Sequence, residues 1–90
     1  MNDDAPITAK VEQFIRTRFR VRADDTFFSP QVNLWEEGYI DSTGAVELIA
    51  FLEQTYQIHL SEEVLFDPDF TSVRGISRLV DRAVQAHAAA

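Results

Sequence analysis

The stretch DSTGAVELIAFL at residues 41–52 decides how this chain folds, because it reads as the start of a helix. An Asp-Ser pair is followed by apolar residues at steps of three and four, which predicts a helix from Asp41 or Ser42 to about Tyr56. Backbone N–H groups in a first helical turn have no partner within the helix, and the helix dipole favours negative charge there. A phosphate esterified to Ser42 would therefore be well placed, and we interpret Ser42 as a residue that is modified rather than an enzyme nucleophile.

Three further segments outside this stretch have the periodicity of helices. Apolar residues recur at helical steps from residue 7 to about Arg20, Ser61 precedes a short segment at 62–65, and Thr71 or Ser72 precedes a longer one to about Gln85. We expect the tail at 86–90 to fray. Since no segment alternates as a strand would, the fold class is predicted as all-α: a small four-helix bundle with a long loop between the first and second helices and a short third helix.

The length of 90 residues allows one domain, with its core at about residues 7–85. We expect the loop at residues 22–40 to be fixed to the bundle by its aromatic side chains, Phe27, Phe28 and Trp35. The interior is predicted to consist of apolar residues from all four helical segments and the loop: Phe14, Phe19, Phe28, Leu48, Leu52, Tyr56, Leu60, Ile76 and Val80.

Charge and composition exclude several classes of function. Fifteen acidic residues against eight basic ones give a net charge of −7, and no Lys or Arg lies between Arg22 and Arg74. Such a field repels nucleic acid and attracts basic protein surfaces, although acidic residues can also serve solubility alone. There is no cysteine, His59 and His87 are far apart, and no acidic cluster has the spacing of a metal site, so we predict neither an enzyme nor a metal protein. No apolar run has membrane-spanning length, and we expect a cytoplasmic monomer.

Several short motifs resemble those of the acyl carrier protein family. They are GYIDS at residues 38–42, VELI at 46–49 and FLE at 51–53, followed by IHL at 58–60 and TSV at 71–73. The resemblance implies that Ser42, next to Asp41, receives 4′-phosphopantetheine from coenzyme A through a phosphodiester. The terminal thiol of that arm would hold acyl or aminoacyl groups as thioesters. Implied partners are a phosphopantetheinyl transferase, an adenylating ligase or acyltransferase, and downstream biosynthetic enzymes.

The chain departs from the common family pattern just after the serine. Thr43 and Gly44 stand where many members have leucine and an acidic residue. The Asp-Ser-Thr-Gly motif looks more like that of discrete carriers in specialised polyketide, nonribosomal peptide or fatty acid pathways. Gly38 and Gly44 flank the attachment point, and we expect them to leave the tether unobstructed.

Two surfaces complete the prediction. The outward face of the second helix is expected to dock partner enzymes through Thr43, Val46, Glu47, Ala50 and Glu53. Any cavity that shelters the cargo is expected to be bordered by Phe51, Leu52, Ile76 and Val80. The alternative to a carrier is an acidic helical interaction module that is never modified.

Overall fold

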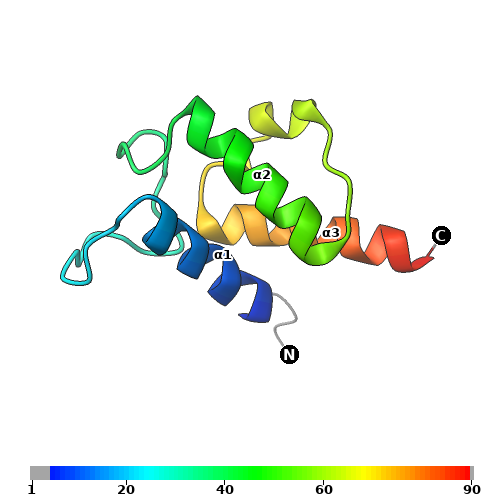
Figure 1. The fold of residues 1–90 in the computed structure, drawn as a ribbon, viewed down its shortest axis with the longest axis horizontal. Helices are drawn as coiled ribbons and strands as arrows, with labels where there is room; N and C mark the ends of the chain where they lie inside the picture. Colours follow the sequence, from blue (N-terminus) through cyan, green and yellow to red (C-terminus); the bar gives the residue numbers. More distant parts are fainter. Residues whose placement is uncertain (1–4, 90) are drawn as a thin grey trace.

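A computed structural model describes residues 5–89 of the chain, with side chains for residues 6–86. The elements are α1 (Ala5–Arg18), α2 (Ser42–Tyr56), the 3-10 helix η1 (Glu62–Phe66) and α3 (Val73–Ala89), and the described residues contain no strand (Figure 1). The all-α prediction is confirmed. The third helical segment is a five-residue 3-10 helix, and it ends before Asp67, whose backbone is extended as expected for a residue that precedes a proline.

The ends of α1 and α2 are set by local backbone geometry. α1 ends at Arg18, two residues before the predicted end at Arg20, because Arg20 adopts the left-handed conformation with φ of 57°. The N–H of Val21 then donates to the carbonyl of Arg16 at 3.0 Å, which closes the helix end. α2 ends at Tyr56 as predicted, with Gln57 in the left-handed conformation. The sequence also offers Asp3, Asp4 and Pro6 as the start of the first helix, and of these Asp3 and Asp4 lie outside the described residues.

The two remaining predicted boundaries concern η1 and α3. Ser61 occupies the N-cap position of η1, but its side chain makes no capping hydrogen bond. Ser72 caps α3, since its hydroxyl accepts the N–H of Gly75 at 3.0 Å. α3 continues to Ala89, through most of the tail for which we expect fraying, and that fraying stays a prediction. None of the described helices is both long and apolar enough to cross a membrane.

The long loop between α1 and α2 is fixed to the beginning of α3 by hydrogen bonds. The N–H of Leu34 donates to Thr71 O at 2.7 Å, and the N–H of Arg74 donates to Pro30 O at 2.9 Å. The indole Nε1–H of Trp35 donates to Phe70 O at 2.8 Å, so Trp35 anchors the loop as predicted. Phe28 is buried, also as predicted, whereas the prediction for Phe27 is wrong because its side chain is 60% exposed.

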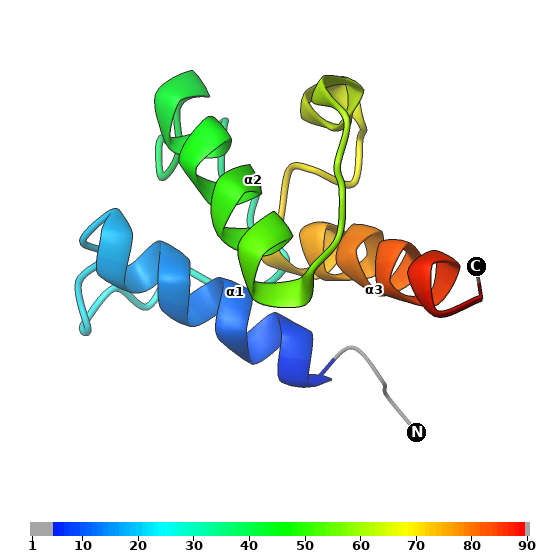
Figure 2. The same ribbon diagram turned by 45° about the vertical axis from the view of Figure 1, so that its right-hand side comes forward.

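The core lies where α1, α2 and α3 meet, and the loop closes one side of it (Figures 1 and 2). Of the predicted interior, Phe28, Leu48, Leu52, Ile76 and Val80 are buried. Phe14, Phe19, Tyr56 and Leu60 are half-buried and pack against that centre. Both views place η1 on the side of the bundle away from α1, where it projects from the helices.

Candidate functional site

Asp41 starts α2 and fixes the position of Ser42. Its carboxylate Oδ1 accepts the N–H of Gly44 at 2.8 Å, and its backbone carbonyl accepts the N–H of Ala45 at 2.8 Å. This is the N-cap arrangement, in which a short polar side chain satisfies a donor of the first turn. Ser42 follows as the first residue of α2, as the sequence predicts.

The Ser42 hydroxyl is available for modification. The residue is exposed, and in the part of the chain that the structure describes its hydroxyl has no hydrogen-bond partner. The N–H groups of Ser42 and Thr43 lie in the first turn of α2, where no carbonyl of the same helix can reach them. These donors and the positive end of the helix dipole suit a phosphate group attached to Ser42.

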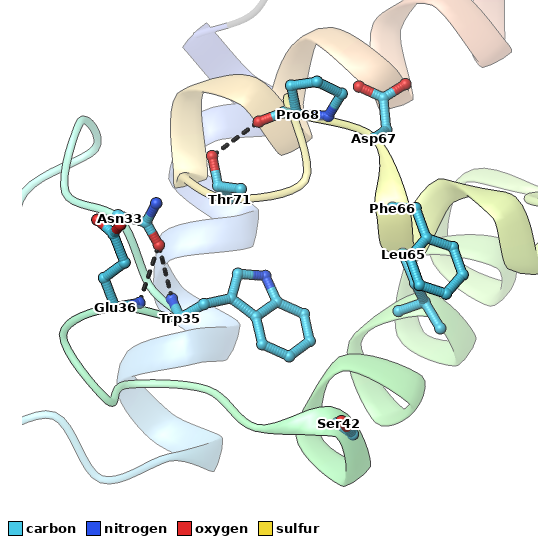
Figure 3. Close-up of a pocket in the computed structure, with 9 residues that line it drawn as sticks. All are labelled: Asn33, Trp35, Glu36, Ser42, Leu65, Phe66, Asp67, Pro68 and Thr71. Carbon is cyan, nitrogen blue, oxygen red and sulfur yellow. Dashed lines mark hydrogen bonds between the residues drawn. The ribbon is translucent and has the colours of Figure 1, made fainter.

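Ser42 borders an open cavity of about 410 Å³ between the long loop and η1 (Figure 3). The indole of Trp35 forms one side, and Leu65 and Phe66 form the other. Asn33, Glu36, Asp67, Pro68 and Thr71 complete the lining. The cavity is mainly apolar and includes no histidine or lysine. Histidine and lysine, the bases that most often activate a catalytic serine, are thus missing from the described lining, whose ionisable side chains are Glu36 and Asp67.

Two tight turns hold the walls of this cavity in place. On the loop side, Asn33 Oδ1 accepts the N–H groups of Trp35 and Glu36, each at 3.0 Å. On the opposite side, the Thr71 hydroxyl donates to Pro68 O at 2.8 Å. Side-chain bonds of this kind replace the backbone pairing that irregular segments lack. The cavity beside Ser42 is therefore formed before any group is attached.

The two glycines near Ser42 differ in role. Gly38 is exposed, with φ of +77° and open space around it, as expected for a glycine that permits a turn. Gly44 is buried, and a Cβ there would lie 2.6 Å from Phe19 Cε1. The expectation that Gly44 keeps the tether clear is wrong, since its surface faces inward. It allows the Phe19 ring to approach α2, and an acidic residue at this position would not lie on the docking surface.

The predicted docking residues lie along α2, but the two acidic residues among them already interact with other residues of this chain. Thr43, Val46 and Ala50 are exposed, with Val46 exposed to 58%. A carboxylate oxygen of Glu47 lies 2.8 Å from Nη2 of Arg18 on α1. Glu53 accepts the N–H of Leu60 at 2.9 Å, and the same carboxylate oxygen lies 3.3 Å from Nδ1 of His59. Both carboxylates thus interact with this chain itself.

The predicted cargo residues do not all share one environment. Leu52, Ile76 and Val80 are buried in the core. Phe51 instead stacks on Phe14 of α1, with ring centroids 4.2 Å apart, and borders a separate shallow hollow of about 250 Å³. That cargo enters the core between α2 and α3 stays a prediction.

Sequence reasoning missed the cavity beside Ser42. Of the residues in its walls, only Ser42 was among the predicted site residues. The sequence offered three separate signals: a serine at a helix start, a tryptophan in the long loop, and a phenylalanine in a short acidic helical segment. They are far apart in sequence. Only the fold brings Trp35 and Phe66 to the same place.

The geometry matches what a comparison with known families finds. A family model described as "Phosphopantetheine attachment site" matches residues 9–80. The chain therefore belongs to this family of acyl carrier proteins, whose members are carriers rather than enzymes and bear covalently attached 4′-phosphopantetheine. No individual curated protein matches the chain.

Proposed function

We propose that Ser42 is the residue that bears 4′-phosphopantetheine, and that the arm holds an acyl or aminoacyl group as a thioester. The observation that carries the proposal is the exposed Ser42 hydroxyl at the start of α2, beside first-turn N–H groups that have no partner within the helix. Asp41 supports it by fixing the first turn through its bond to Gly44 N at 2.8 Å. A flexible arm lets one cargo visit several enzymes at high effective concentration.

The modification transfers the phosphopantetheinyl group from a diphosphate oxygen of coenzyme A to the hydroxyl oxygen of Ser42. The Ser42 Oγ forms a bond to the phosphorus that bears pantetheine in coenzyme A, the diphosphate P–O bond breaks, and adenosine 3′,5′-bisphosphate leaves. The hydroxyl proton passes to a base that the transferase supplies. This chain contributes an accessible oxygen and, from the first turn of α2, donors for the resulting phosphodiester.

The partners follow from this chemistry. They are a phosphopantetheinyl transferase, an adenylating ligase or acyltransferase that loads the thiol, and enzymes of a polyketide, nonribosomal peptide or specialised fatty acid pathway in the cytoplasm. The outward face of α2, with Thr43, Val46 and Ala50 at its centre, is proposed to contact them. Val46 is the exposed large apolar side chain of this face, and the small apolar contact that it offers suits reversible docking.

The test is the intact mass of the protein after incubation with coenzyme A, Mg²⁺ and a broad-specificity phosphopantetheinyl transferase. Wild type should gain one phosphopantetheine, and Ser42→Ala should gain none. Ser61→Ala is the matched control, since Ser61 is also exposed at a helix N-terminus but lies at η1. It should be modified like wild type. An unmodified wild type, or an adduct on Ser42→Ala, would support the alternative of an interaction module that is never modified.

A further inference from the structure

The last residue of η1 presents an apolar side chain to solvent. Phe66 is 86% exposed, more than any other large apolar residue among the described side chains. It borders the cavity beside Ser42, and it also borders a second hollow of about 430 Å³ lined by His59, Leu60, Glu63 and Val64. Phe66 therefore stands on a ridge between two depressions. Large exposed aromatic residues of this kind are frequent anchors of protein interfaces.

Acidic side chains around this ridge differ from those elsewhere. Elsewhere several carboxylates are paired with arginines: Glu12 with Arg16 on α1, Asp24 with Arg22 in the loop, and Asp69, in the turn before α3, with Arg82. Within residues 6–86, no ion pair involves Glu62 or Glu63 of η1, or Glu36 of the loop, which lines the cavity beside Ser42. The negative charge of η1, and that of Glu36 in the cavity that Ser42 borders, is thus free to attract a basic partner.

We propose that Glu62, Glu63 and Phe66, the η1 ridge, form the surface on which the phosphopantetheinyl transferase docks. This inference rests on the proposed function of Ser42. The transferase must hold coenzyme A, a polyanion, so cations surround the mouth of its active site. To reach Ser42 it must bring that mouth over the cavity that Ser42 and Phe66 share. The free carboxylates then face the cations of the transferase, and Phe66 enters an apolar depression on it.

The test compares the initial rates of Ser42 modification by the transferase for two phenylalanine variants. Phe66→Ser should lower kcat/KM about tenfold, as expected when the anchor of an interface is removed. Phe27→Ser is the matched control, because Phe27 is 60% exposed but belongs to the segment at residues 22–28, which lies beside α1 and away from η1 (Figures 1 and 2). It should stay within about twofold of wild type. Both substitutions are at exposed positions, so thermal melting should be unchanged.

Each outcome of this comparison has a distinct meaning. Equal rates for Phe66→Ser and wild type, or an equal loss in both variants, would overturn the docking proposal while leaving Ser42 as the attachment site. If wild type gains no phosphopantetheine, the proposed function itself fails. Two further measurements test whether the ridge instead binds the arm or a second copy of this chain. Chemical shift changes at Phe66 on attachment of the arm, with an unchanged rate, would make the arm the occupant. A wild-type dimer abolished by Phe66→Ser in sedimentation would make it a second copy.

Discussion

The two surfaces that flank Ser42 hold their acidic residues in different ways. On the α2 face, Glu47 is paired with Arg18 at 2.8 Å, and Glu53 accepts the N–H of Leu60. On the η1 ridge, Glu62 and Glu63 have no cation within ion-pair distance among the described side chains. A carboxylate that is already engaged must lose its internal partner before it can bind an enzyme. Whether a carboxylate can bind a partner therefore depends on its contacts in the fold as well as on its charge.

The largest expected effect comes from removing the support of the η1 ridge. A methyl group at Gly75 would overlap the carbonyl of Asp69, in the turn that joins η1 to α3. Backbone has little freedom to retreat, so Gly75→Ala should lower the free energy of unfolding by about 3 kcal/mol. Urea denaturation followed by circular dichroism measures this.

Gly44→Ala is the corresponding change beneath the α2 face. There the added methyl meets the outer ring atoms of half-buried Phe19, which can rotate, and alanine favours the helix. Its cost should stay below about 1 kcal/mol. Equal losses for the two variants would mean that the turn before α3 adapts as easily as the Phe19 ring.

Charge reversal on the η1 ridge is expected to have the next largest effect. Glu63→Lys should lower kcat/KM of the transferase about fivefold, through lost attraction and new repulsion, and the deficit should shrink as salt is added. Asp24→Lys changes the net charge equally but lies in the loop beside α1, where Asp24 pairs with Arg22 at 3.1 Å. If both variants lose the same amount, only the total charge matters and the ridge has no special role.

A smaller effect is expected from releasing a carboxylate on the α2 face. Arg18→Gln removes the partner of Glu47, so the face gains a free negative charge beside Val46. The rate of modification at low salt should rise about twofold. Arg22→Gln, which releases Asp24 on the distant loop, serves as the control. A fall in rate for Arg18→Gln would indicate that Arg18 itself contacts the enzyme.

The smallest effect concerns acid stability of the long loop, whose far end leads to Ser42. The hydroxyl of Tyr39 donates to Asp25 Oδ2 at 2.8 Å, and this bond is the main cause that lowers the pKa of Asp25 below its ordinary value of 3.8. Because the folded-state pKa lies below the unfolded one, the ionised carboxylate stabilises the fold above pH 3.8, and this contribution is lost as the pH falls through the folded value.

Asp25→Asn should therefore lower the melting temperature at neutral pH, and the difference from wild type should shrink in acid. Asp24→Asn, at an exposed neighbouring position, is the control for the loss of one negative charge in this loop. A pH-independent difference for Asp25→Asn would assign the effect to packing of the loop instead of to the carboxylate charge.

The three α-helices and the position of Ser42 could be predicted from the sequence because their signals are local. Asp41 caps α2 across three residues, and Ser72 caps α3 in the same way. What could not be predicted depends on partners distant in sequence. Arg18 is 29 positions from Glu47, and Trp35 is 35 positions from the carbonyl that it binds. The inward role of Gly44 and the exposure of Phe66 likewise follow from how the segments assemble, since η1 is too short for its periodicity to define a buried face.

The bond from Trp35 to Phe70 has a practical consequence. Trp35 is the single tryptophan of the chain, and its indole is held at the wall of the cavity that Ser42 borders. Its fluorescence therefore reports on this cavity alone, with no background from another indole. An arm attached at Ser42 and lying in the cavity would displace water from the ring and shift the emission to shorter wavelength. The intrinsic tryptophan fluorescence of the protein can therefore be used to follow attachment of its prosthetic group without a label.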